Sequence, residues 1–328
     1  MNAIEEVARR AGVSRATVTR VVQGHRYVSA GTRARVQQVV QELDYRPSSA
    51  ARTLASGRAG ALGVVLGGPL DPESATWVAA VERATRLTGR ALVVRTVPDG
   101  CPGSLTRAVQ ELAAQQVDGI ALLCPSQEVD LPRLRDAAGT VPLQSAHDWE
   151  GEHNTWTSSG VLAVRHLRSV GHAVVHVVVG DPEAARAQAL LRRSTVGPST
   201  ARVRVVTVGR DPAGTGPTVA TALATSGASA VVAESDRTAW HLLSDLRRLG
   251  VRVPEDVALV SCGDAPGAAF SRPGLTVVRH HLAGPATRLV DGLLHGPAVR
   301  PPSAGPPDVE LVVRGSCGTT AGRLAAAG

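Results

Sequence analysis

Seven short apolar runs between residues 61 and 263 determine the fold class of most of this chain. Each run is rich in Val, Leu and Ala, and each is separated from the next by a stretch long enough for a helix. Continuous apolar runs of this kind are typical of strands buried on both faces of a parallel sheet. The sequence therefore predicts an α/β body from about residue 60 onward, with strands in ALGVVLG, RALVVRT, VDGIALLC, HAVVHVVVG, ARVRVVTVG, ASAVVAE and DVALVSCG.

A different pattern precedes these runs. Apolar residues from Ile4 to Ala11 follow the i, i+3, i+4, i+7 spacing of an amphipathic helix, and Gly12 tolerates the left-handed backbone that can end it. Ser14 is a favourable N-cap for a second helix. We expect four side chains of that helix to face the first helix: Thr17, Val18, Val21 and Val22. Two short helices joined by a tight turn form a helix-turn-helix.

A third helix completes this small domain. Ser29 can cap it, and its apolar stripe comprises Val36, Val39, Val40 and Leu43. A core of about 45 residues is only marginally stable by itself. The sequence thus predicts a helix-turn-helix domain over residues 1–45.

The positive charge of the chain is concentrated in the same region. The protein carries a net charge of +7, and residues 1 to 60, here called the head, hold ten Arg against four acidic residues. The remaining residues, here called the body, are almost neutral. A general preference for arginine could supply such residues, since the chain has no lysine, but it would act evenly along the sequence. The asymmetry favours a head that binds a polyanion.

The predicted second helix directs two arginines away from the other helices. Arg15 and Arg20 lie on its outward face, where they are either solvated surface charges or contacts to DNA. An arginine fork can bond guanine O6 and N7 in the major groove, which distinguishes guanine from other bases. The small hydroxyls of Ser14, Thr17 and Thr19 suit phosphate contacts that set the register.

The head resembles that of the lactose and galactose repressor family of bacterial transcription regulators. The resemblance lies in IEEVARRAGVSRATVTRVVQG, YVSAGTRARV and LDYRPSSAARTLASGR, which cover residues 4 to 58 almost completely. It implies base readers at Arg15, Ala16 and Arg20. It also implies five residues that lie near the DNA backbone: Ser14, Thr17, Thr19, Tyr27 and Ser29. Gln23 stands where the family usually has Asn.

Residues 46–59 follow as a hinge helix and linker. Pro47 opens the segment SSAARTLASG, and Gly57 lies at its end, in the order expected for helix boundaries. In the family this helix forms on DNA, and the resemblance places Leu54 as a wedge between base steps in the minor groove. Ala51 matches the small residue where two hinge helices pack, and Ser48 replaces the usual Asn. The alternative is an ordinary linker.

The resemblance also implies the organisation of residues 60–328. The body of the family consists of two α/β subdomains of periplasmic-binding-protein type, which bind a small molecule between them and also form the dimer. The segments GVRVPEDVALVS, LTVVR and VELVVRGS are similar to its late motifs. We expect the chain to cross between the subdomains near residues 153–157, 276–281 and 305–309.

The effector site departs from the pattern of sugar-binding members. The residues matching its positions are Asp71, Trp156, Gln188, Ser235 and Asp236, with Thr155 and Gly263 at two further positions. Sugar-binding members usually place there an Arg, an Asn-Asp pair and another Asp, because ring hydroxyls need paired donors and acceptors. Only Asp236 retains the usual residue type. Trp156 could stack on a ring or simply pack in the core.

Enzyme functions fit the sequence less well. The glycine-rich segment GRDPAGTG at 209–216 has Thr215 where a phosphate-binding loop needs lysine. His166, His172 and His176 could ligate a metal, but their glycine-then-strand context favours structural roles. No G-x-S-x-G nucleophile motif occurs. We therefore expect neither an enzyme nor a cofactor or metal site.

The leading hypothesis is a homodimeric transcription repressor that binds a palindromic double-stranded operator and is controlled by a small-molecule effector, a sugar or related metabolite. The alternative keeps the DNA-binding head but treats the body as a ligand-independent dimerisation scaffold. A third class, a solute-binding protein for uptake, would need an export signal and no basic head. We expect a cytoplasmic protein that does not span the membrane, because no apolar segment reaches about 18 residues.

Overall fold

The structure of the protein is a computed structural model. It describes residues 3–22, 27–45, 59–68, 70, 72–98, 100–124, 129–146, 155–180, 202–208, 215–296 and 308–318. The chain divides into two compact units, one of residues 1–60 with 115–117 and one of the remaining residues. No helix among the described residues is both long enough and apolar enough to cross a membrane.

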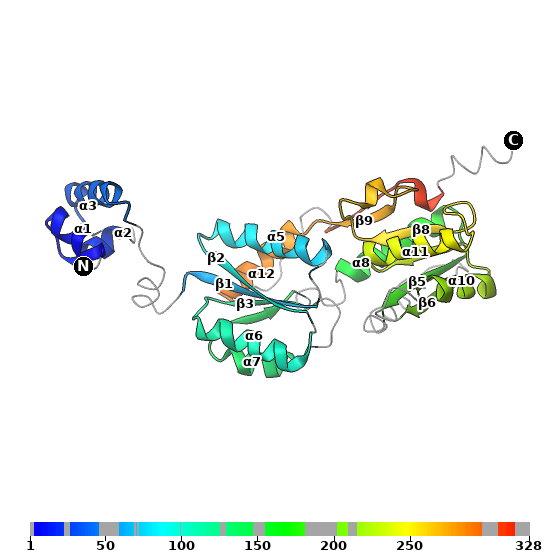
Figure 1. Ribbon diagram of the computed structural model, residues 1–328, viewed down its shortest axis with the longest axis horizontal. Coiled ribbons are helices and arrows are strands. Elements are labelled where there is room, and N and C mark those ends of the chain that lie inside the picture. Colours follow the sequence, from blue (N-terminus) through cyan, green and yellow to red (C-terminus); the bar gives the residue numbers. More distant parts are fainter. Residues whose placement is uncertain are drawn as a thin grey trace. The chain divides into compact units, whose positions relative to one another are not determined.

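The head contains three short helices (Figure 1). A glycine ends the first helix, and serine N-caps begin the second and the third. Their bounds are α1 Ala3–Ala11, α2 Arg15–Val22 and α3 Ala30–Glu42. Gly12 has a φ of 63°, which ends α1 at the turn. The hydroxyls of Ser14 and Ser29 accept hydrogen bonds from the backbone N–H groups three residues later, at the starts of α2 and α3.

The core of the head is small and fully apolar. Val7, Val18 and Val36, one from each helix, are completely buried against one another, and Ala8, Ala11 and Val21 extend the same cluster. Because so few side chains form this core, each contributes a large share of the head's stability. The helix-turn-helix predicted from the apolar spacing is therefore formed.

The first lobe of the body has a four-stranded parallel sheet in the order β2-β1-β3-β4. Its strands are β1 Ala61–Gly67, β2 Ala91–Val97, β3 Ile120–Leu123 and β4 Leu143–Ser145. Every residue of β1 and β3 is buried. This explains why both strands read as continuous apolar runs in the sequence.

Helices cover both faces of this sheet (Figure 1). They are α5 Pro72–Leu87, α6 Pro102–Ala114, α7 Leu131–Ala138 and α12 Ala283–His295. Figure 1 shows α5 and α12 on one face and α6 and α7 on the other. Leu289 and Leu293 of α12 pack with Leu62 and Leu66 of β1, although more than two hundred residues separate them in the sequence. The late helix α12 is thus part of the first lobe.

The second lobe has a six-stranded sheet in the order β10-β9-β8-β7-β5-β6, and β10 alone in this sheet runs antiparallel to its neighbour. Its strands are β5 Val174–Gly180, β6 Arg202–Val208, β7 Ala230–Ala233, β8 Ala258–Cys262, β9 Thr276–His280 and β10 Val309–Val312. Its α-helices are α8 Thr155–Ser169, α10 Thr215–Ser226 and α11 Asp236–Arg248, and single 3-10 turns lie at η4 Ala268–Phe270 and η5 Gly315–Cys317.

Alternate residues of each central strand pack into different cores. In β8, Val260 lies with Leu167 of α8 in one cluster, whereas Leu259 lies with Leu242 and Leu246 of α11 in the other. Both faces of the sheet are therefore apolar, and the sequence shows no alternation. The predicted α/β fold class with an N-terminal helix-turn-helix is confirmed.

Candidate functional site

The residues predicted to read DNA bases lie on the outward face of α2. Arg15, Ala16 and Arg20 are exposed, whereas Val18 and Val21 on the opposite side are buried. The hydroxyl of Thr19 donates to the backbone carbonyl of Arg15 at 3.1 Å. The helix therefore presents two arginines and a small residue to solvent, on the face predicted to enter a major groove.

The residues predicted to contact the DNA backbone include hydroxyl groups at two helix starts and an exposed aromatic ring. Ser14 is bonded to Thr17 at the start of α2, and Ser29 to Thr32 at the start of α3, so both serines hold helix starts in place. Backbone N–H groups at helix starts attract anions such as phosphate. Tyr27 is 99% exposed, so its ring packs against nothing in the described part of the head.

Several predicted site residues fall outside the part of the chain that the structure describes. These are Ser48, Ala51 and Leu54 of the hinge, Asp71 and Gln188 of the effector site, and Gln23. Thr155 and Trp156 lie in the first turn of α8, but their side chains are likewise outside the description. Their predicted roles therefore remain predictions.

A cavity of about 70 Å³ lies in the body at the carboxyl ends of β8 and β9. Ser235, Asp236 and Gly263, which the resemblance places at effector-site positions, line it. The starts of α5 and α11, the loop after β8, the end of β9 and the chain just beyond it contribute its other residues: Pro72, Glu73, Thr76, Arg237, Asp264, Ala265, Arg279, His280 and Leu282. A crevice at the carboxyl ends of parallel strands is where α/β proteins usually bind ligands.

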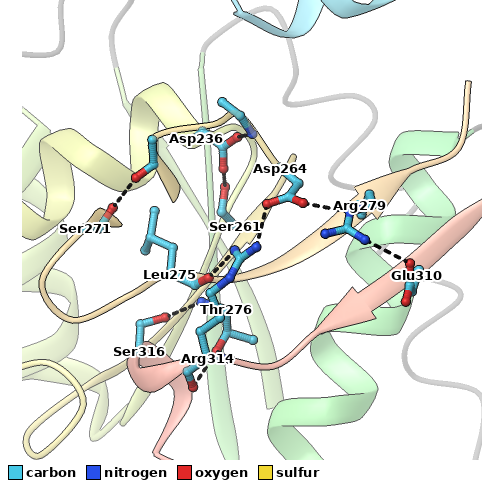
Figure 2. Close-up of polar contacts among 12 residues, drawn as sticks. Asp236, Ser261, Asp264, Ser271, Leu275, Thr276, Arg279, Glu310, Arg314 and Ser316 are labelled. Carbon is cyan, nitrogen blue, oxygen red and sulfur yellow. Dashed lines mark hydrogen bonds and ion pairs between the residues drawn. The ribbon is translucent and has the colours of Figure 1, made fainter. Parts of the chain in front are cut away.

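Asp236 is built into the wall of this cavity. Its carboxylate accepts hydrogen bonds from the Ser261 hydroxyl and from the Ala265 backbone N–H, both at 2.6 Å (Figure 2). Burial raises the pKa of Asp236, although these two hydrogen bonds act in the opposite direction. A Cβ atom at Gly263 would lie 2.9 Å from Asp236 Oδ2, so the carboxylate occupies the space that a side chain at position 263 would need.

Two arginines contact Asp264: Arg279 on β9 and Arg314, which follows β10 (Figure 2). Arg279 Nε lies 2.7 Å from Asp264 Oδ2, and Arg314 Nη2 lies 2.9 Å from Oδ1. Arg314 also donates to the Leu275 carbonyl at 2.8 Å, and Arg279 reaches Glu310 on β10 at 3.4 Å. This network fixes the loop after β8 against β9 and so shapes one side of the cavity.

His280 lies where the chain leaves the second lobe. One ring nitrogen is 2.7 Å from the Ser159 hydroxyl on α8. Burial, and to a smaller extent the neighbouring His281, lowers the pKa of His280 to about 4. At neutral pH His280 is therefore an uncharged hydrogen-bonding group beside the cavity.

We expect the body to lose stability as the pH falls from 6.5 to 4. In the unfolded chain His280 takes up a proton near its ordinary pKa of 6.5, whereas in the folded protein it resists protonation down to about 4. The lowered pKa values of His166 and His176 act with the same sign, and the raised pKa of Asp236 opposes them. The free energy of unfolding, measured with urea, should be on the order of 1 to 2 kcal/mol lower at pH 5 than at pH 7.5.

The adjacent histidine provides the control for this prediction. His281 is half exposed and contacts Glu310 at 3.1 Å. His280→Gln should flatten the pH dependence, whereas His281→Gln should change it less, because burial is the larger cause of the lowered pKa of His280. If His280→Gln and the parent lost stability equally as the pH falls, His280 would not be the source of the pH dependence.

Three histidines that the sequence offered as possible metal ligands lie in separate environments and do not form a metal site. His166 lies 3.3 Å from the Cys317 sulfur, and His172 lies 2.7 Å from the Ser229 hydroxyl. His176 is buried in β5, and neither of its ring nitrogens has a hydrogen-bond partner. No group of three metal-binding side chains occurs among the described residues.

Sequence reasoning missed Asp264, Arg279 and His280 as cavity residues. Asp264 follows Gly263 directly, and Arg279 and His280 lie within a predicted crossover, so their positions gave a weak signal. Their contacts to Arg314, Glu310 and Ser159 join segments far apart in the chain, which residue spacing cannot indicate.

Comparison with known proteins matches the head and much of the body to known domain families. Residues 3–48 match the model of bacterial regulatory proteins of the lacI family, and residues 164–317 match the periplasmic binding protein-like domain. The chain is 27% identical to the HTH-type transcriptional repressor PurR of Pectobacterium atrosepticum, over 85% of each chain. It is 26% identical to the ribose operon repressor of Escherichia coli K12, over 90% of this chain and 93% of that repressor.

Solved structures of the same architecture are similar over nearly the whole chain. The lac repressor dimer bound to operator and an anti-inducer gives a TM-score of 0.75 at 24% identity, and the match covers 96% of this chain and 99% of the repressor. A complex of the regulator CelR with cellobiose gives 0.59 at 25% identity and covers 96% and 100%. The head therefore contains a helix-turn-helix domain of the lacI family, and the body contains a periplasmic-binding-protein-like domain.

Proposed function

We propose that the protein is a transcription repressor that binds a specific DNA sequence through α2 and changes its DNA affinity when a small molecule binds in its body. The observation that carries this proposal is the exposed pair Arg15 and Arg20 on the second helix of a helix-turn-helix, within a head of ten arginines and four acids. Both arginines suit guanine, and Ala16 leaves room for close approach to the base edges.

The remaining DNA contacts follow from the same placement. Ser14, Thr17, Thr19, Tyr27 and Ser29 lie around α2 and the start of α3, and we assign them to the DNA backbone. Residues 46–59 are proposed as the hinge between the helix-turn-helix domain, 1–45, and the effector-binding and dimerisation domain, 60–328. We assign its residues Ser48, Ala51 and Leu54 to the minor groove.

A homodimer on a palindromic operator is the expected assembly. A single head makes few base contacts, and two-fold pairing doubles them on a site with the same symmetry. The similar lac repressor structure is named as a dimer bound to operator, which supports this arrangement. We place the protein in the cytoplasm, where DNA is available, and we propose a binding rather than a catalytic function, in line with relatives that are named as repressors.

The effector is proposed to bind at the cavity lined by Ser235 and Asp236. Relatives named for ribose control and a similar structure named with cellobiose support a sugar or related metabolite. Gln188 and Gly263 replace residues that sugar-binding members usually have. We therefore propose that different hydrogen-bonding side chains bind the ligand in this protein. The charged groups Glu73 and Arg237 line the same cavity and add to that set.

The base-reading assignment can be tested with Arg20→Ala. We expect this change to weaken operator binding by roughly 1 to 3 kcal/mol and binding to random DNA much less, because it removes a base contact. Arg35→Ala is the matched control, since Arg35 is exposed on α3 and its loss changes the net charge equally. Both affinities are measured at one salt concentration after selection of the operator from a random pool. Equal losses on both DNAs would reject base reading by Arg20.

The effector assignment can be tested by thermal shift against sugars, nucleosides and other metabolites. A true ligand at about one hundred times its Kd should stabilise the native state by about 2.7 kcal/mol. Thr76 lies at the cavity with an exposed side chain, so Thr76→Trp should block the shift while leaving the fold intact. A ligand that shifts the parent and Thr76→Trp equally binds elsewhere.

A further inference from the structure

An acidic residue contacts the recognition helix of the head. Glu5 Oε1 lies 2.9 Å from Nη1 of Arg15, although ten residues separate them in the sequence. Both side chains are largely solvent-exposed, at 46% for Glu5 and 63% for Arg15. The pair therefore lies on the surface that the proposed function assigns to DNA.

The next acidic residue along α1 makes different contacts. Glu6 bonds Arg9 and Arg10 of its own helix, and these contacts lower the pKa of Glu6 to about 2. The Glu6 contacts thus stay within α1, whereas Glu5 reaches across to another helix. Exposed ion pairs contribute little to stability, so the Glu5 contact has little value for the fold.

On a DNA-binding surface a carboxylate is unfavourable, because it repels phosphates. Its contact with Nη1 leaves the Nε and Nη2 groups of the Arg15 fork available to bond guanine. If Arg15 turns toward a phosphate instead, it leaves Glu5 unpaired beside the DNA backbone. The carboxylate therefore penalises the phosphate-bound arrangement more than the base-bound one.

We propose that Glu5 is a positioning residue that increases the sequence specificity of the protein by holding Arg15 for guanine and opposing its use as a phosphate contact. This inference rests on the proposed base-reading function of Arg15. Glu5 lowers affinity for random DNA more than affinity for the operator.

The test compares Glu5→Gln with Glu42→Gln in the full-length protein. Glu42 lies at the end of α3 and contacts Gln38 at 2.8 Å, so its substitution makes the same charge change away from Arg15. Kd is measured at one salt concentration on the selected operator and on random DNA of equal length. Glu5→Gln should tighten random-DNA binding about 10-fold and operator binding less than about 3-fold, whereas Glu42→Gln should change both equally. Equal changes for Glu5→Gln on both DNAs would overturn the proposal.

A double-mutant cycle with Arg15→Ala separates positioning from direct contact. In the Arg15→Ala background, Glu5→Gln should no longer alter the ratio of the two affinities. If it still does, Glu5 contacts a base itself, as a carboxylate can contact the amino group of cytosine, and the positioning role is wrong. Arg15→Ala alone tests the underlying function, because an unchanged operator preference would show that Arg15 reads no base whatever Glu5 does.

Discussion

Replacing Val36 by Asp is expected to unfold the head and abolish operator binding. Val36 is completely buried and packs with Val7 and Val18 of the other two helices. An unpaired carboxylate in this position costs more than about 4 kcal/mol, which exceeds what so small a core can supply. The body should keep its own unfolding transition, because it is a separate compact unit.

The neighbouring position provides the control for this prediction. Gln37 is exposed on α3, so Gln37→Asp adds the same charge without entering the core. Calorimetry and limited proteolysis would follow the two units, and a gel-shift assay would follow operator binding. Normal operator affinity in Val36→Asp would show that α3 is not needed to hold α2.

Arg314→Ala is expected to give the second-largest effect, a loss of about 3 kcal/mol in the stability of the body. The change removes a guanidinium from Asp264 and from the Leu275 carbonyl. The Arg314 side chain is only 19% exposed and that of Asp264 only 14%, so water replaces these bonds poorly. Arg279 still contacts the other carboxylate oxygen of Asp264, which limits the loss of stability.

An exposed ion pair of the same chemistry serves for comparison. Arg252 contacts Asp256 at 2.7 Å, but its side chain is 69% exposed. Urea unfolding should show a far smaller loss for Arg252→Ala than for Arg314→Ala. Arg314→Lys should recover only part of the stability, because an ammonium group cannot reproduce the two-pronged contact. Similar losses for the two alanine variants would mean that the Asp264 network does not stabilise the body.

Local signals in the sequence were sufficient for most of the fold. The spacing of Val18 and Val21 predicts the buried side of α2, and Ser29 caps α3 as expected. Each of the seven apolar runs coincides with a strand to within one residue at its C-terminal end or contains it entirely. The three-residue strand β4 was missed, because LQS is too short and too polar to distinguish from a loop.

The cavity could be predicted only in part. Ser235 and Asp236 were found through a resemblance that fixes positions along the chain. The contact between Asp264 and Arg314 joins residues fifty positions apart, and the space filled by Asp236 beside Gly263 depends on how α11 meets β8. Such features arise from packing between elements, so no local pattern in the sequence encodes them.

The position of α12 in the first lobe also has a consequence for biosynthesis. Strands β1 to β4 are complete by residue 145, but one face of their sheet is partly covered by α12 (Figure 1), whose Leu289 and Leu293 pack with β1. A ribosome must therefore make the whole of β5 to β9 before that face can close. Until then the nascent chain exposes apolar surface of the kind that chaperones bind, so the two lobes mature together rather than one after the other.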